Sequence, residues 1–168
     1  MNRLIKKVTE DLENFRFNNN SAYNLGTRGS YGFLLSLDGF GQNGEVNNNY
    51  IKDAFIIGIE NTGYDNFIFD SNIFTGTTTS YAPFGFSHHQ TSAYIKKCIV
   101  SNNIAVGLNL MPYFKETNES LFSGNTFTSP TSSIAYTNCN NNTFANETYE
   151  GLNYGFYIES SSPRTSTL

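Results

Sequence analysis

Short apolar words separated by polar corners recur along this chain. One of them, N-F-I-F-D-S-N-I-F-T-G at residues 66–76, places two apolar bursts on either side of Asp70, Ser71 and Asn72. Similar words stand at 15–23, 98–107, 121–128 and 139–144. Phe, Ile and Tyr favour strands, whereas Asn, Gly and Ser favour turns. The pattern therefore predicts an all-β chain of short strands joined by polar corners.

The predicted strands are short and are not arranged as hairpins. They lie at 15–17, 31–37, 54–59, 67–69, 73–75, 84–86, 98–100, 104–108, 121–122, 126–128, 134–136, 143–144 and 154–158. Asn-Gly occurs once, at 43–44, and Asp-Gly occurs once, at 38–39. Sandwiches and up-and-down barrels usually show more of these two-residue turns, so a β-sandwich binding module is disfavoured.

A repeat gives these strands an order. The segment 50–63 aligns with 94–107 at an offset of 44 residues, half of which is 22. Asparagines at successive corners show a looser version of this period, at Asn20, Asn48, Asn72, Asn103, Asn125 and Asn142. A recurring period in the low twenties is typical of a solenoid. Because Leu is scarce and strand words dominate, we predict an all-β parallel β-helix of about six or seven rungs over residues 16–158.

Stacked coils explain why one word recurs. Parallel strands of successive coils lie about 4.8 Å apart, so apolar residues at one position form an inward column. An Asn at a tight corner bonds backbone groups of its own coil and the side-chain amide of the neighbouring Asn, which forms a ladder. We therefore predict that Phe67, Phe69, Ile73 and Phe74 lie in the core and that Asn72 is one step of the ladder.

Residues 1–15 carry the one helical pattern in the sequence. Leu4, Ile5, Val8, Leu12 and Phe15 fall on one helical face, opposite charged residues. The ends of a stack expose unpaired strand edges, so we predict an amphipathic N-terminal helix that caps the first rung. At the other end, the Ser/Thr-rich segment 159–168 is predicted to be a flexible tail.

Composition excludes several classes of protein. With 15 Phe and 11 Tyr, the chain is too aromatic to be disordered. Its net charge of −4 and its scattered Lys and Arg argue against a nucleic-acid partner. No apolar run approaches the roughly eighteen residues of a membrane span. The N-terminus has no apolar core of a secretory signal.

The two cysteines, Cys98 and Cys139, stand beside strand-like words and have no C-x-x-C spacing. They are predicted to be buried free thiols rather than zinc ligands. We expect neither a metal nor a cofactor.

The words S-N-I-F, N-N-I-A-V-G, G-N-T-F and N-N-T-F resemble those of the right-handed parallel β-helix superfamily, which includes pectate-lyase-like enzymes and phage tailspikes. The resemblance covers roughly residues 15–158 and concerns the fold. It implies a right-handed parallel β-helix and, through the tailspikes, a homotrimer. It brings no catalytic residue with it, since a shared fold does not fix a function.

Two acidic residues are the candidates for catalysis. Asp65 and Asp70 flank the strand at 66–69. Two carboxylates about 5 Å apart or somewhat further could hydrolyse a glycosidic bond, with His88 as a third group. The alternative is that both are solvated corner residues.

Aromatic residues gather where the repeat is interrupted. The segment 77–92 contains Tyr81, Phe84, Phe86, His88 and His89, and the segment 109–117 contains Tyr113 and Phe114. Such residues suit a contact with a neighbouring subunit, stacking on a sugar ring or packing within the chain itself. Adjacent histidines in a strand point to opposite faces, so this pair is not expected to share a metal.

Two functions stay open. The first is a structural or adhesive β-helix of a virus or phage particle, such as a tail spike or fibre. It would be virion-associated, made in the cytoplasm without a signal peptide, and homotrimeric or bound to other virion proteins, and its loops would contact host surface glycan. The alternative is a polysaccharide lyase or glycoside hydrolase.

Overall fold

The computed structural model describes residues 4–8, 13–23, 33–37, 41–52, 57–61, 64–76, 85–87, 95–107, 112–128, 134–151 and 156–159. Every regular element in these ranges is a β-strand, and no helix occurs among them. For β1, β4, β8, β12 and β23 the backbone alone is described. The prediction of an all-β chain is confirmed.

Three parallel sheets account for most strands. Sheet 1 consists, in spatial order, of β1 (Leu4–Val8), β4 (Phe33–Leu37), β8 (Ile57–Asn61), β12 (Gly85–Ser87), β16 (Tyr113–Lys115), β20 (Ile134–Thr137) and β23 (Phe156–Glu159). Sheet 2 consists of β2 (Arg16–Asn18), β6 (Glu45–Asn47), β10 (Ile68–Asp70), β14 (Ile99–Ser101), β18 (Leu121–Ser123) and β21 (Thr143–Ala145). Sheet 3 consists of β3 (Ser21–Tyr23), β7 (Tyr50–Lys52), β11 (Ile73–Thr75), β15 (Ile104–Val106), β19 (Thr126–Thr128) and β22 (Thr148–Glu150).

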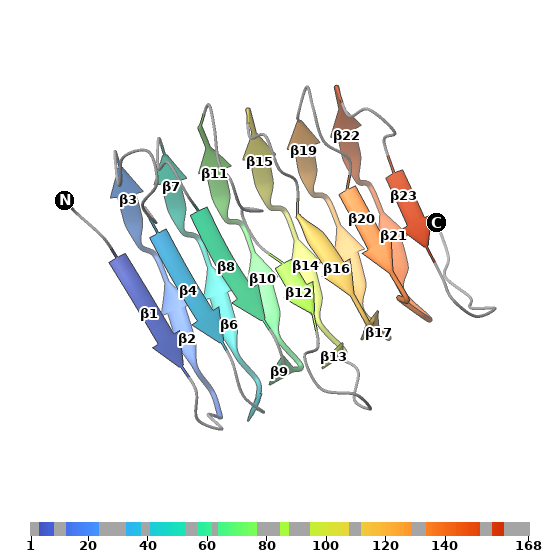
Figure 1. The fold of residues 1–168 in the computed structure, drawn as a ribbon, viewed down its shortest axis with the longest axis horizontal. Coiled ribbons are helices and arrows are strands. Elements are labelled where there is room, and N and C mark those ends of the chain that lie inside the picture. The colour runs from blue at the N-terminus through green and yellow to red at the C-terminus, as the bar shows by residue number, and fades with distance from the viewer. Residues whose placement is uncertain are drawn as a thin grey trace.

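Two short pairs lie between sheets 1 and 2 in chain order. They are β5 (Gly41–Gln42) with β9 (Tyr64–Asp65), and β13 (Ile95–Lys96) with β17 (Thr117–Asn118). The chain passes from sheet 1 through this region to sheet 2 and sheet 3, and then returns to sheet 1 one strand further along. We call one such circuit a coil. Successive coils lie side by side from the N-terminal to the C-terminal end (Figure 1), as in a β-solenoid.

The core is built from the middle residue of each three-residue strand. Side chains alternate across a strand, so a strand of three residues turns its middle one inward and the other two outward. On sheet 2 the inward column is Val46, Phe69, Val100, Phe122 and Phe144. On sheet 3 it includes Ile51, Phe74, Ala105 and Phe127. Parallel register therefore converts one apolar residue per strand into a continuous core.

Aromatic rings fill the C-terminal half of this core. The ring of Phe114 stacks on that of Tyr136 with centroids 5.0 Å apart, and Phe122 stacks on Phe144 at 5.0 Å. Phe114 and Phe122 meet edge to face at 4.7 Å across the interior. Rings of both sheets therefore interlock, which holds sheet 1 against sheet 2.

The corner between sheets 2 and 3 has a fixed two-residue form. Its first residue has a positive φ and is Asn19, Asn48, Ser71, Asn102, Gly124 or Asn146 in successive coils. Asn and Gly tolerate this left-handed conformation better than other residues. The second residue turns inward, and it is Asn20, Asn49, Asn72, Asn103, Asn125 or Glu147. This corner explains much of the asparagine in the sequence.

The inward corner residues form a hydrogen-bonded column, here called the ladder. The Nδ2 atom of Asn72 donates to Oδ1 of Asn103 at 2.9 Å and to the backbone oxygen of Val46 at 2.7 Å. Its Oδ1 accepts from the backbone N–H and the Nδ2 of Asn49, at 3.1 and 2.9 Å. Every donor and acceptor of this buried amide is therefore satisfied, which removes the cost of burying it.

The N-terminal helix predicted for residues 1–15 is wrong in the part of the chain that the structure describes. Leu4–Val8 form strand β1, which pairs in parallel with β4 from Leu4↔Phe33 to Val8↔Leu37. An isolated helix of this length is marginal in water. Pairing with β4 instead satisfies backbone groups of an otherwise open sheet edge. Residues 9–12, which also belong to the predicted helix, lie outside the described ranges.

The repeat has the predicted step of 22 residues, but the predicted alignment is wrong. Between Ser120 and Asn142, and between Asn103 and Asn125, one coil spans 22 residues. The offset of 44 would place Ile51 on Ile95, yet Ile51 belongs to sheet 3 and Ile95 to the short strand β13. Insertions of different length in the N-terminal coils shift the register.

The structure also corrects the predicted positions of three residues, Asn48, Asn142 and Ile73. The ladder contains Asn49 instead of Asn48, because Asn48 takes the left-handed position before it. Asn142 belongs to the other corner, before sheet 2, where its Oδ1 accepts from the N–H of Ser120. Ile73 is half-buried on the outer side of β11, whereas Phe74 faces inward. The predicted core positions of Phe67, Phe69 and Phe74 are confirmed.

We expect the ladder to contribute strongly to stability. Replacing Asn103 with Ala leaves the backbone N–H and the Nδ2 of Asn72 without their acceptor. Since a buried polar group left unsatisfied costs about 1–3 kcal/mol, the free energy of unfolding should fall by about 3 kcal/mol or more. Urea unfolding followed by circular dichroism measures this change.

The matched control is Asn102→Gly, one residue earlier. Asn102 is exposed and left-handed, and Gly124 occupies the same position in the next coil. This variant should lose much less stability than Asn103→Ala. Equal losses in both variants would contradict a special role for the ladder.

Candidate functional site

The aromatic segment 77–92 lies mostly outside the described residues. Tyr81, Phe84, His88 and His89 belong to the undescribed part. Phe86 is placed by its backbone in β12, in register with Phe114 of β16.

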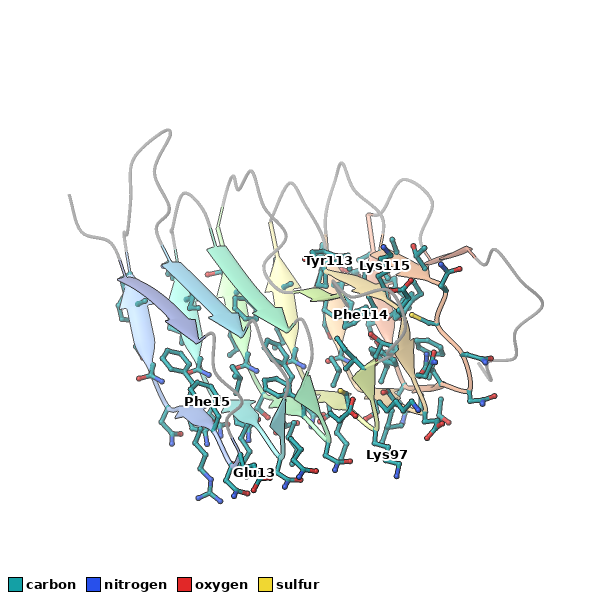
Figure 2. All side chains as sticks on the ribbon, turned by 60° about the horizontal axis from the view of Figure 1, so that its bottom comes forward. Glu13, Phe15, Lys97, Tyr113, Phe114 and Lys115 are labelled. Carbon is teal, nitrogen blue, oxygen red and sulfur yellow. The ribbon has the colours of Figure 1, made fainter. Side chains whose placement is uncertain are left out.

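Of the second aromatic pair, one residue belongs to the core. Phe114 is 1% exposed, and Figure 2 shows it turned inward between Tyr113 and Lys115. It is therefore unavailable to a ligand or a subunit, which corrects its assignment as a contact residue. Tyr113 is half-buried on the opposite side of β16. The same alternation that builds the core separates these two neighbours.

The two candidate acids have separate partners. Asp65 ends β9, and its Oδ1 accepts from the backbone N–H of Lys96 at 2.7 Å. Asp70 ends β10 on sheet 2. The corner after β9 and the first two residues of β10 separate the two carboxylates in the chain. No described residue donates a hydrogen bond to both carboxylates.

Asp70 is held by hydroxyl and amide donors of two coils. Its Oδ2 accepts from Ser71 Oγ at 2.8 Å, and its Oδ1 accepts from Asn102 Nδ2 at 2.9 Å and from the hydroxyl of Ser101. Burial raises the pKa of Asp70, but these three hydrogen bonds outweigh it and lower the pKa below the usual value. A carboxylate kept ionised in this way is poorly suited to act as a general acid.

We predict that Asp70 is a structural acceptor. Because its pKa is lowered in the folded state, ionised Asp70 adds stability above its unfolded pKa of about 3.9, and this stability is lost as the pH falls through the folded pKa. Asp70→Asn should therefore lower the thermal midpoint at pH 7, and the difference from the wild type should shrink as the pH falls below about 3.9. The exposed control Glu150→Gln removes the same charge and should change neither midpoint appreciably.

Both cysteines are buried and remain thiols, as predicted. Burial raises the pKa of Cys98 to about 12, against hydrogen bonds that lower it. A thiol with so high a pKa is a poor nucleophile. Cys98 belongs to the corner before sheet 2, where its backbone N–H donates to Ser120 Oγ at 2.9 Å.

The outer face of sheet 2 carries an apolar column. Ile68, Ile99 and Leu121 occupy the same register position in three successive coils. Ile99 is 39% exposed and Leu121 is 38% exposed, while Ile68 is half-buried. We call these three residues the aliphatic column. Adjacent coils lie about 4.8 Å apart, so the three side chains form one contiguous stripe rather than scattered apolar residues.

The outer face of sheet 3 is also partly apolar near the corner. Tyr50, Ile73 and Ile104 share one register position and are half-buried. Tyr23 is 51% exposed and meets the ring of Tyr50 edge to face at 5.5 Å. In the sequence, both stripes are marked by an apolar residue directly before each inward residue. This signal was missed because Ile73 was predicted to lie in the core.

The last ladder residue is a carboxylate. Glu147 Oε1 accepts from the backbone N–H and the Nδ2 of Asn125, at 3.0 and 2.8 Å. Its Oε2 accepts from the hydroxyl of Tyr149 at 3.1 Å, and that hydroxyl lies 3.4 Å from the hydroxyl of Tyr136. Burial raises the pKa of Glu147, although the donors from Asn125 and Tyr149 oppose the shift. Sequence reasoning missed this residue, which an offset of 22 from Asn125 would have found.

We predict a pH-dependent cost at Glu147. Because its pKa is raised in the folded state, the stability it contributes is fully present below its unfolded pKa of about 4.3 and is lost as the pH rises through the folded pKa. Glu147→Gln keeps an acceptor for Asn125 without the charge. Its thermal midpoint should exceed that of the wild type at pH 7, and the difference should shrink toward pH 4. A constant difference across this range would contradict the prediction.

Within the described ranges, no group of three or more His, Cys, Asp or Glu side chains could hold a metal ion. The same ranges contain no helix long and apolar enough to cross a membrane. No protein-family model matches the chain, and neither a curated protein nor a solved structure matches it.

Proposed function

We propose that this protein is a structural or adhesive component of a virus or phage particle, of the tail-spike or fibre kind. In this proposal the stacked parallel sheets form a right-handed parallel β-helix, and the protein is virion-associated. It assembles as a homotrimer or with other virion proteins, and the aromatic residues of segment 77–92 contact host surface glycan.

The observation that carries the proposal is the aliphatic column on sheet 2. A column of Ile68, Ile99 and Leu121 on the outside of a solenoid is costly to leave in water, and contiguous exposed apolar stripes mark contact surfaces. Three side chains cover far less than the roughly 800 Å² per partner of a stable interface. The contact is therefore expected to extend over more of the outer face of the molecule.

The interior of the molecule supports a structural role. The ladder satisfies the buried amides of the central coils, and aromatic rings interlock between sheets 1 and 2. Such an interior resists deformation along the stack, because each coil is bonded to both neighbours. A rigid rod with apolar stripes on its flank suits a particle component.

No observation favours the alternative, a polysaccharide lyase or glycoside hydrolase. A glycoside hydrolase needs two carboxylates acting on one bond. Asp65 accepts from Lys96, whereas Asp70 accepts from Ser71, Ser101 and Asn102.

We predict that Ile99→Lys weakens assembly. Ile99 is the central member of the aliphatic column, and a lysine there would place a charge in the proposed contact. Sedimentation velocity should show a trimer for the wild type and a shift to monomer, by about tenfold or more in dissociation constant, for the variant.

The control is Asn66→Lys, which adds the same charge at an exposed corner position that Lys97 occupies in the next coil. It should sediment like the wild type. A wild-type protein that stays monomeric at high concentration would refute the trimer. Glycan-array screening of the wild type tests the adhesive part separately.

A further inference from the structure

Two columns of outward side chains flank the corner between sheets 2 and 3. They are formed by the first residue of each sheet 2 strand and the third residue of each sheet 3 strand, which lie at equal distances in the chain from the corner. The sheet 2 outer column is Arg16, Glu45, Ile68, Ile99, Leu121 and Thr143. The sheet 3 outer column is Tyr23, Lys52, Thr75, Val106, Thr128 and Glu150.

The exposed large apolar side chains of the described ranges all lie in these two columns. They are Ile99 and Leu121 on sheet 2, and Tyr23 and Val106 on sheet 3. Tyr23 is 51% exposed, and the other three are between 37% and 39% exposed. Single exposed apolar residues are normal on a protein surface. Their restriction to two columns on either side of one corner instead indicates a contact surface on each face.

The two columns are complementary coil by coil. In the first coil, Arg16 lies in the sheet 2 outer column and the exposed ring of Tyr23 lies in the sheet 3 outer column, a pair suited to a cation–π contact. In the next coil, Glu45 lies in the first column and Lys52 in the second. If like faces met with equal coils opposed, Glu45 or Lys52 would face its own copy. Unlike faces therefore match, whereas like faces oppose equal charges.

The corner between the two faces carries no charged side chain at its left-handed position in the coils that the structure describes. The residues there are Asn19, Asn48, Ser71, Asn102, Gly124 and Asn146. By contrast, the corner before sheet 2 includes Lys97 and Glu119 at its left-handed position. Asp70, the carboxylate directly before the uncharged corner, is held by three donors of its own chain. This corner can therefore face its symmetry copies without repulsion between like charges.

We propose that copies of this chain bind each other through two different faces, with the outer face of sheet 2 of one copy packed on the outer face of sheet 3 of the next. The inference rests on the homotrimer of the proposed function and names the surfaces that join it. A closed ring of three needs a heterologous contact of this kind. The uncharged corner, which lies between the two faces, turns toward the symmetry axis.

This arrangement determines which residues meet. When the stacks run along the axis, rotational symmetry sets equal coils at equal height. Residues at equal distances from the corner then face each other, so Ile99 of one copy meets Val106 of the next. One coil away from the centre of the contact, the aliphatic column continues at Ile68 and Leu121. Toward the N-terminal end, Glu45 meets Lys52 of the next copy.

Sedimentation velocity at pH 7 compares the full-length wild type with Ile99→Lys, Val106→Lys and the control Asn66→Lys. Each of the first two variants places a charge in one of the two faces, so each should raise the dissociation constant of the trimer by about tenfold or more. Asn66→Lys should sediment like the wild type. Circular dichroism verifies the fold of each variant. Should Val106→Lys fail to fold, Tyr23→Lys replaces it, because it sets a second cation opposite Arg16.

An exchange of charges tests whether the two faces meet directly. The double variant Ile99→Lys with Val106→Glu places opposite charges across the contact and should recover the trimer. The double variant Ile99→Lys with Val106→Lys should stay dissociated. An equimolar mixture of the two single variants should give at most a dimer of one chain of each, because each variant keeps one intact face and the ring cannot close.

The possible results separate this inference from the proposed function. If Val106→Lys assembles like the wild type while Ile99→Lys dissociates, like faces meet, and the inference is wrong although the assembly stands. A charge-exchanged variant that associates no better than Ile99→Lys also overturns the inference. A wild-type protein that stays monomeric at high concentration refutes the trimer itself and this contact with it.

Discussion

The asparagine ladder is the interaction on which the rest of this structure depends. A chain that turns sharply between two sheets buries polar backbone groups at each corner, and these groups need partners away from water. Asn72 shows the solution: one amide bonds the coil before it, the coil after it and a backbone oxygen of Val46. A left-handed residue before each inward amide makes this geometry accessible. The corners therefore fix the register in which the core columns align.

Once the register is fixed, alternation within each short strand separates three environments. Middle residues such as Phe69 and Phe122 fill the core. The third residue of a sheet 2 strand joins a polar network, as Asp70 does with Ser101. The first residue faces outward, and in the central coils it is Ile68, Ile99 or Leu121. A single register thus produces the interior and the surface on which the proposed function rests.

The ends of such a stack differ from its flanks. Each flank is covered by the outward side chains of its own coils, whereas an end is formed by the edge strands of the sheets. At the N-terminal end, β1 extends sheet 1 by one strand where the sequence suggests a helix. At the C-terminal end, the ladder changes from amide to carboxylate at Glu147. Each ladder amide donates to the next coil, and Glu147 can only accept. The two ends of the ladder are therefore chemically distinct.

Much of the architecture can be read from local patterns. Stacked parallel strands are predicted by short apolar runs, a scarcity of hairpin turns and a step near 22 residues. Each of these features is visible in the order of the residues alone. Strands such as Ser21–Tyr23 and Thr148–Glu150 escaped prediction because a three-residue strand needs only one inward residue. Asp65 and Asp70 are close in sequence and looked like a pair, yet they accept hydrogen bonds at different positions of the next coil, from Lys96 and from Asn102.

The sequence by itself determined the class of fold, the existence of a corner ladder and the burial of both cysteines. These properties depend on residue type and on short-range spacing. Only the tertiary structure decided that Asn49 and Glu147 belong to the ladder, that Phe114 faces inward and that Leu4–Val8 form a strand. Each of these depends on register between coils, and a shift of one residue moves a side chain from the core to the surface. Insertions of unequal length hide that register in the sequence, whereas hydrogen bonds between coils establish it in the folded chain.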